Sequence, residues 1–185
     1  MNTQMALENL LEVESIRQLS FLYSRACDRL DRDLLEQVYW PDGTDDHGGF
    51  KGSAPEYIDW VMAFLEGWIS TQHNNSNFLI EVDGNQATGE LHWTGFYRYE
   101  VDGVPHDQLS AGRYLDRYEK RFGQWRIFHR TCTSEWTRAM PVDVDWRADP
   151  GPAIIGTRDS SDPLYQLQRR GRLLGSNKHR APHSR

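Results

Sequence analysis

The spacing of apolar residues changes once along this chain, near Gln72, and this change limits the fold more than any other feature. Before that point apolar residues recur every three or four positions, as on a helix with one buried face. After it they alternate with polar residues, as on a strand with one buried face. Helices followed by strands predict an α+β domain in which the helices pack on one face of a curved antiparallel sheet.

The first part of the chain predicts helices over residues 4–29, 33–39 and 54–69. Asp31 is suited to cap the second helix, because an Asp side chain accepts hydrogen bonds from the free N–H groups of a first turn. The sequence Pro41-Asp42-Gly43 indicates the end of that helix. Pro55 is suited to the first turn of the third.

The second part predicts a meander of four or so strands. Residues 78–82 and 86–99 flank the turn signal Asp83-Gly84, and residues 108–121 and 125–137 flank Phe122-Gly123. We therefore expect a domain over residues 1–140. Residues 141–185 are rich in Pro, Gly, Asp, Ser and Arg, which predicts an irregular extension, basic at its end, that either wraps over a neighbouring subunit or is disordered.

Charge and hydropathy exclude some classes of protein. The formal net charge of −6 disfavours nucleic acid as the main partner, although the last twenty residues are basic. The longest apolar run, residues 60–65, is far shorter than the roughly 20 residues that span a bilayer. Acidic residues at positions 8, 12 and 14 stand where a secretory signal needs a basic stretch. We expect a cytoplasmic protein with no membrane or nucleic-acid partner.

Three side chains are candidates for acid–base chemistry. His73 lies at the start of the β-rich part and can act as a general base if a carboxylate orients it, although a structural hydrogen bond is the alternative. Asp28 lies near the carboxyl end of a helix, where negative charge is unfavourable, which points to a functional role, with an ordinary surface Asp as the equal alternative. Tyr23 points about 140° away from Asp28 around that helix, so the two can flank one cavity.

Aromatic residues make up 12% of the chain and are suited to a core or an apolar pocket. On the strand around residues 91–99, aromatic residues share one face. On that face Trp93 is suited to the core, and Tyr97 is suited to the lining of a pocket. The sequence Asp45-Asp46-His47 also suggests a metal site, and on a strand Asp45 and His47 would share one face. Two ligands without a third are a weak basis, so we expect no metal.

Several short motifs follow one another in an order found in a known family. They are Tyr23-x4-Asp28-x2-Asp31, Trp40-Pro41-Asp42-Gly43, Gly48-Gly49-Phe50-Lys51-Gly52, Thr71-Gln72-His73-Asn74, Ile80-Glu81-Val82-Asp83-Gly84-Asn85-Gln86-Ala87 and Tyr118-Glu119-Lys120-Arg121-x2-Gln124-Trp125-Arg126-Ile127. Together they resemble the SnoaL-like branch of the NTF2-like superfamily, a cystatin-like α+β cone that includes polyketide cyclases, scytalone dehydratase, bile-acid 7α-dehydratase and lindane dehydrochlorinase. The resemblance covers about residues 6–138.

The resemblance implies roles for particular residues. Asp28 and His73 would form the dyad that removes a proton, at a distance of about 2.6–3.2 Å or through one water. Tyr23 would donate a hydrogen bond to a carbonyl or to the departing oxygen, with Arg130 assisting. The remaining site residues are expected to bind substrate: His47, Trp93, Tyr97 and Trp40.

The function implied is that of a cofactor-independent lyase of the dehydratase type, acting on a small hydrophobic alcohol that is aromatic or polycyclic. An isomerase or polyketide cyclase would use the same base. Small subunits of ring-hydroxylating dioxygenases share the fold without catalysis, and a ligand-binding protein is a further alternative. We also expect a homo-oligomer, with a trimer favoured over a dimer, in which a neighbour covers apolar residues such as Phe96 and Tyr114 on the open face of the sheet.

Overall fold

A computed structural model of the chain describes residues 3–145 and 147–170. Three helices precede most of the sheet: α1 (Thr3–Arg29), α2 (Arg32–Val38) and α3 (Ala54–Glu66). The strands are β1 (Tyr39–Asp46), β2 (Lys51–Ser53), β3 (Ser70–Asp83), β4 (Gln86–Val101), β5 (Val104–Arg121) and β6 (Gln124–Pro141), and helix α4 (Pro163–Arg170) follows them. This α+β arrangement confirms the predicted fold class.

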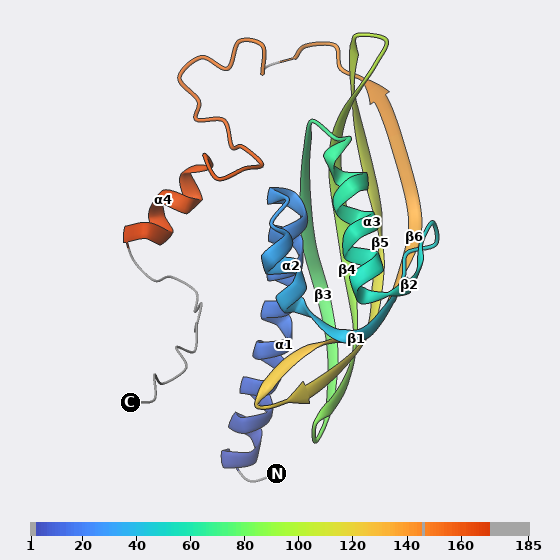
Figure 1. The fold of residues 1–185 in the computed structure, drawn as a ribbon, viewed down its shortest axis with the longest axis vertical. Coiled ribbons are helices and arrows are strands. Elements are labelled where there is room, and N and C mark those ends of the chain that lie inside the picture. The colour runs from blue at the N-terminus through green and yellow to red at the C-terminus, as the bar shows by residue number, and fades with distance from the viewer. Residues whose placement is uncertain (1–2, 146, 171–185) are drawn as a thin grey trace, which may run out of the picture.

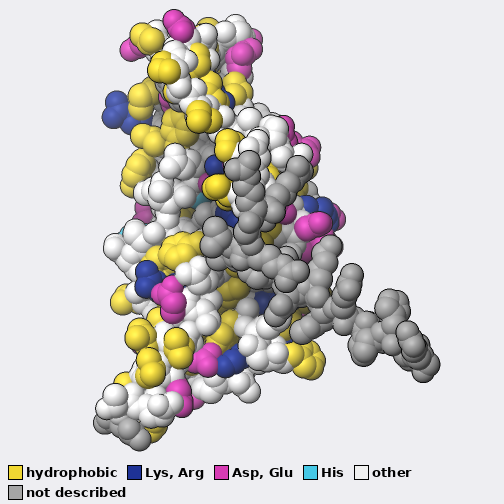
Figure 2. Space-filling view, turned by 90° about the vertical axis from the view of Figure 1, so that its left-hand side faces the viewer, with side chains coloured by type: hydrophobic (Ala, Val, Ile, Leu, Met, Phe, Trp, Pro, Cys, Tyr) yellow, Lys and Arg dark blue, Asp and Glu magenta, His cyan; other side chains and the backbone are white. Residues whose placement is uncertain are grey.

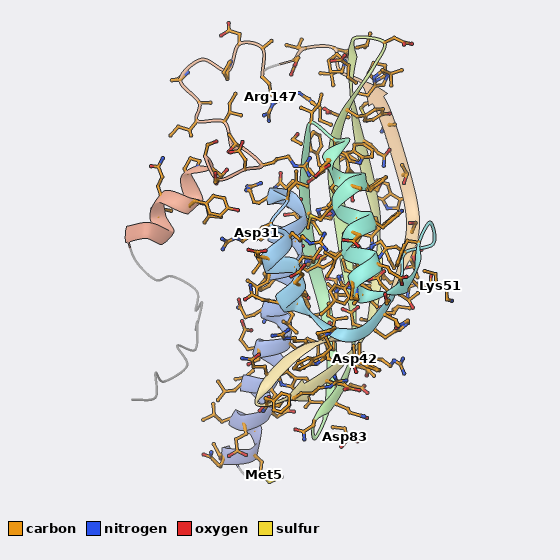
Figure 3. The ribbon with its side chains drawn as sticks, in the orientation of Figure 1. Met5, Asp31, Asp42, Lys51, Asp83 and Arg147 are labelled. Atoms are coloured by element: carbon orange, nitrogen blue, oxygen red, sulfur yellow. The ribbon has the colours of Figure 1, made fainter. Side chains whose placement is uncertain are left out.

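The strands form one curved, unclosed sheet in the order β2-β1-β6-β5-β4-β3. Neighbouring strands are antiparallel except for β1 and β6, which are parallel. Helices α1 and α3 lie over the same face of the sheet (Figure 1). Side chains from the two helices and that face fill the space between them (Figure 3), and the main core lies there.

The helices begin and end close to the predicted positions. The Asp31 side chain accepts a hydrogen bond from the backbone N–H of Leu34 at 3.0 Å, which confirms it as the cap of α2. Ser53 and Glu56 form a capping box at the start of α3, with Pro55 in its first turn. Helix α3 ends at Glu66, three residues earlier than expected, because the chain then enters β3 at Ser70.

Strand β1 and the short β2 were not predicted. Strand β3 begins at Ser70, close to the predicted change of spacing near Gln72 but eight residues before the strand expected over 78–82. Pro41 and Gly43, predicted to end a helix, lie inside β1. They are tolerated because the pairing of β1 with β6 shifts its register between Tyr39 and Thr44. At such an irregular position the chain does not need the backbone N–H that proline lacks, and glycine accommodates the irregular backbone.

The segment that follows β6 returns over the chain's own helix ends. Asp145 accepts a hydrogen bond from the guanidinium of Arg98 at 2.6 Å. The Arg158 side chain donates to the backbone carbonyls of Leu65, in the last turn of α3, and Trp68, just after it, at 2.8 and 2.6 Å. The part of residues 141–185 that the structure describes therefore packs on the domain, and residues 171–185 of the expected extension lie outside the described residues.

Apolar side chains of the first three turns of α1 are exposed, contrary to the expected buried face. Met5 and Leu10 are 60% and 61% exposed, and Leu7 and Leu11 are similar. Met5 lies at the end of the molecule where α1 begins (Figure 3). The view of the side that carries α4 shows hydrophobic side chains among charges of both signs (Figure 2). No helix of residues 3–145 and 147–170 is long and apolar enough to cross a membrane.

The sheet leaves no space for a side chain at Gly112. Strand β5 is irregular between Ala111 and Gly112, and a Cβ at Gly112 would overlap the carbonyl oxygen of Thr133 on β6. We expect Gly112→Ala to lower the free energy of unfolding by about 2–3 kcal/mol, as overpacking of a core does. Gly67→Ala is the matched control. Its free energy of unfolding is expected to stay within about 0.5 kcal/mol of that of the wild type, because its Cβ would make only ordinary van der Waals contact. Urea unfolding of both variants tests this, and equal stabilities would contradict the register of β5 against β6.

Candidate active site

A cavity of about 220 Å³ lies between α1, α3 and the covered face of the sheet. Its walls are mainly aromatic, and two histidines, one near each sheet edge, open onto it. The lining includes Tyr23, Cys27, His47, Trp60, Trp68, His73, Trp93, Tyr97, Tyr114 and Cys132. Of the eight residues expected at the site, five line the cavity, and Asp28 is hydrogen-bonded to one of them. Arg130 lies behind the lining, and Trp40 lies away from it.

Asp28 and His73 form a hydrogen-bonded pair at one wall of the cavity. The Asp28 carboxylate, at the end of α1, accepts from His73 Nδ1 at 2.7 Å and from Thr71 Oγ1 at 2.9 Å. It also accepts from the backbone N–H of His73 at 2.9 Å. Because an ionised carboxylate only accepts, the imidazole Nδ1 carries a proton and Nε2 faces the cavity. The arrangement is that of an oriented general base.

Tyr97 lies on the neighbouring strand β4 and holds its hydroxyl 3.0 Å from His73 Nε2. Gly95, opposite His73 in the sheet, makes this possible, since a Cβ there would lie 2.5 Å from the Tyr97 hydroxyl oxygen. Burial raises the pKa of Tyr97, so the hydroxyl is protonated and can donate to Nε2. Tyr97 is therefore a cavity residue in direct contact with the base.

A second histidine–carboxylate pair faces the same cavity from the other side. His47 follows β1, and its Nδ1 lies 2.6 Å from Oδ1 of Asp45, which is almost fully buried. The other carboxylate oxygen of Asp45 accepts from the Tyr39 hydroxyl at 2.6 Å. The sequence pattern placed Asp45 and His47 on one face of a strand as weak candidates for metal ligands, and the resemblance implied that His47 binds substrate, but neither predicted that the two form a pair. Their spacing of two residues was the signal for this pair.

Tyr57 of α3 connects His47 to Tyr23. The Tyr57 ring stacks on the imidazole with centroids 4.8 Å apart, and its hydroxyl lies 3.3 Å from His47 Nε2. The same hydroxyl is hydrogen-bonded to the Tyr23 hydroxyl. Burial raises the pKa values of Tyr57 and Tyr23 well above normal, so both hydroxyls carry protons. Sequence reasoning missed Tyr57, because nothing separates it from the other apolar positions of α3.

The two cysteines of the cavity are thiols rather than thiolates. Burial raises the pKa of Cys27 to about 12 and that of Cys132 to about 12. Since the thiolate is the nucleophilic form, the cavity is suited to acid–base chemistry rather than to a cysteine nucleophile. Within residues 3–145 and 147–170, no group of three or more His, Cys, Asp or Glu side chains is arranged to hold a metal ion.

Arg130 does not reach the cavity, which corrects the expectation that it assists at a leaving group. Its side chain is fully buried and donates to both carboxylate oxygens of Asp116 at 2.7 Å. Burial alone would lower the pKa of Arg130, but the Asp116 charge raises it well above normal. The guanidinium lies 4.3 Å from the Tyr23 ring centroid and 3.9 Å from that of Tyr114. Arg130 supports the wall of the cavity from behind.

Trp40 and Tyr114 also differ from expectation. Successive strand residues point to opposite faces, so the inward position of Tyr39 turns Trp40 away from the cavity. Trp40 instead donates to the Glu119 carbonyl at 2.9 Å and packs against the guanidinium of Arg121. Tyr114 does not lie on the open face of the sheet but lines the cavity, stacked on Trp93 with centroids 5.8 Å apart.

Comparisons with known proteins agree with this fold. Residues 8–131 match the SnoaL-like domain. The chain belongs to the SnoaL-like family. An uncharacterised protein of Mycobacterium tuberculosis, Rv2910c, is 30% identical over 129 residues, which is 68% of this chain and 86% of that protein.

Solved structures of other proteins share the fold of this SnoaL-like domain. A Novosphingobium aromaticivorans protein provisionally named a scytalone dehydratase has a TM-score of 0.63 at 24% identity, over 74% of this chain and 91% of that one. The hexachlorocyclohexane dehydrochlorinase LinA-type3 of Novosphingobium barchaimii has a TM-score of 0.63 at 19% identity, over 76% of this chain and 96% of that one. At these identities the likeness establishes the fold.

The position of Arg130 leads to a stability prediction. Arg130→Met leaves the Asp116 carboxylate buried without its counter-ion, so we expect the free energy of unfolding to fall by about 3–5 kcal/mol. Adding Asp116→Asn should restore part of the loss, because the amide is neutral and can still accept from Tyr118. Arg113→Met, at a more exposed ion pair, should cost less than about 1 kcal/mol. Urea unfolding measures all three, and an Arg130→Met protein of normal stability would contradict the structural role.

Proposed function

We propose that this SnoaL-like protein is a cofactor-independent lyase that eliminates water from a small hydrophobic alcohol. The observation that carries the proposal is the Asp28–His73 pair, with His73 Nε2 directed into an aromatic cavity. An adjacent carboxylate stabilises the imidazolium that forms when the ring takes up a proton. Its structural neighbours include one protein provisionally named a dehydratase and one named a dehydrochlorinase, both names for eliminations.

In the proposed reaction His73 removes a proton from a carbon next to an activating group such as a carbonyl. The entering substrate takes the place of the Tyr97 hydroxyl at Nε2, and that hydroxyl is then free to donate to the carbonyl oxygen. The aromatic lining limits water, which strengthens the effect of each polar group on developing charge. Proton transfer at such a carbon needs neither a redox group nor a metal, so the proposal includes no cofactor.

The size of the cavity narrows the substrate class. A cavity of roughly 150 Å³ accommodates benzene, and this one measures about 220 Å³. The volume therefore fits an alcohol with one ring or two fused rings better than a larger polycyclic compound. We place the activity in the cytoplasm, because the free thiols of Cys27 and Cys132 suit a reducing compartment.

One observation favours a second candidate, an isomerase. Two histidine–carboxylate pairs open onto one cavity, and moving a proton between two carbons would use one pair to remove it and the other to return it. A structural subunit or a plain ligand-binding protein has no step that requires either pair. Product analysis separates the two enzymes, since only the lyase releases water.

The proposed base leads to a kinetic prediction. With the bicyclic β-hydroxy ketone 3-hydroxy-1-indanone as the probe, His73→Ala should lower turnover by at least about 100-fold, because it removes the base and leaves the cavity. Asp28→Asn should lower turnover nearly as much, since a neutral amide does not stabilise the imidazolium. His92→Ala, an exposed histidine of β4, is the control and should have little effect. Full activity of His73→Ala would show that the pair is only structural.

We also propose that the protein is a homo-oligomer, a trimer in preference to a dimer. Apolar side chains are left exposed on the first turns of α1, and Leu109 and Trp136 are 40% and 53% exposed on strands β5 and β6. Burying such surfaces between copies would be favourable. Sedimentation at micromolar concentration should give a species of three chains, and a 21.6 kDa species would contradict the proposal.

A further inference from the structure

The second histidine belongs to a continuous chain of hydrogen bonds that ends at the cavity wall. The chain runs from the Asp45 carboxylate to His47, from His47 Nε2 to the Tyr57 hydroxyl, and from there to the Tyr23 hydroxyl. Tyr23 lines the cavity, whereas Tyr57 is fully buried behind it. Proton removal by His73 uses none of these groups, although a carboxylate–histidine–tyrosine–tyrosine chain is well suited to moving a proton.

The direction of this chain depends on the protonation of His47. When the imidazole is neutral, Nδ1–H donates to Asp45 and Nε2 accepts from Tyr57, so Tyr57 in turn accepts the proton of Tyr23. When the imidazole is protonated, Nε2–H donates to Tyr57, Tyr57 donates to Tyr23, and the Tyr23 proton is free to point into the cavity. One hydroxyl has one proton, so the two directions exclude each other.

We propose that His47 is the proton reservoir and Tyr57–Tyr23 the relay that protonates the leaving oxygen in the elimination. This inference rests on the proposed function. His73 Nε2 takes the substrate proton, the C–H electron pair forms the C=C bond, and the C–O bond breaks with its electrons on oxygen. That oxygen takes the Tyr23 proton, Tyr23 takes that of Tyr57, and Tyr57 takes that of His47 Nε2. Water and an alkene leave, and exchange with solvent then moves one proton from His73 to His47.

The surroundings of His47 support a reservoir that gains and loses a proton. Asp45 pairs with it from β1 and is itself hydrogen-bonded by Tyr39. The rings that contact the imidazole are those of Tyr57 and Trp60 from α3, the latter with its centroid 6.4 Å away, and of Tyr114 from β5. Asp45 is thus the carboxylate that pairs with the imidazolium. The positive charge of Arg130, behind Tyr23 and Tyr114, is paired with the Asp116 carboxylate. Its repulsion of a proton on His47 is therefore reduced.

Leaving groups that differ in their need for a proton test the relay. The probes are 3-hydroxy-1-indanone, whose hydroxide must be protonated, and its acetate ester, whose carboxylate leaves without a proton. We expect His47→Gln to lower kcat for the alcohol by at least about 100-fold and kcat for the ester by less than about fivefold. Tyr57→Phe should show the same selectivity, while His73→Ala should lower both rates. Equal losses on the two probes, or none, in His47→Gln would overturn the relay.

A binding measurement tests the relay without turnover and separates its failure from failure of the lyase proposal. The probe is 4-nitrophenol, above its own pKa, so that it binds as the oxyanion and its colour reports that it stays ionised. An oxyanion that accepts from Tyr23 leaves the Tyr23 oxygen as an acceptor for Tyr57, and Tyr57 then has an acceptor to donate to and a donor to accept from only when His47 is protonated. Under the relay, calorimetry in two buffers should therefore show uptake of about one proton per site. Uptake should persist in His73→Ala and vanish in His47→Gln.

The outcomes of the two experiments are distinct. If the wild type eliminates neither indanone but proton uptake depends on His47, the lyase proposal fails for this substrate class and the relay stands. If 4-nitrophenol does not bind, or uptake survives His47→Gln and is lost in His73→Ala, the relay is overturned. His92→Gln controls for changes in surface charge, and it should alter neither the kcat ratio nor the proton uptake.

Discussion

The Asp28 carboxylate joins the helical part of this chain to its sheet. A carboxylate at the end of a helix, out of water, is destabilising unless its oxygens are satisfied. Here three donors from one segment of β3, Thr71 Oγ1 and both the backbone and the ring nitrogen of His73, satisfy them. The same contacts fix α1 against β3 and orient His73. The position of the proposed base is therefore a consequence of how the domain closes.

The opposite wall depends on a second buried charge. Asp45 is nearly inaccessible, and within the part of the chain that the structure describes its side chain is hydrogen-bonded by Tyr39 and His47. Beside it, Arg130 pairs with Asp116 and lies against the rings of Tyr23 and Tyr114. Buried ion pairs often add little to stability over apolar packing of the same volume. Their value here is that they hold rigid aromatic walls around a polar relay.

Local structural features and the family could be predicted from the sequence, but contacts between residues far apart in the chain could not. The helix spacing, the Asp31 cap and the hairpin turns follow from contacts within a few residues, which periodicity and turn chemistry report. Strand β1 was missed because Pro41 and Gly43 are usual at ends of elements, and only pairing with β6 shows that a register shift accommodates them. The place of Arg130 depends on Asp116, on a different strand, so its burial carries no local signal.

The two histidine–carboxylate pairs show why a shared cavity follows from the topology. His73 lies near the start of β3 at one edge of the sheet, and Asp45 and His47 lie beside β2 at the other. Curvature turns the covered faces of both edges toward α1 and α3 (Figure 1). His73 and His47, near opposite edges, therefore line the same cavity. An elimination needs a base and an acid on different atoms of one substrate. In the proposed elimination, His73 as the base and His47 as the source of the returning proton would meet that requirement, because both line one cavity and each is oriented by its own carboxylate.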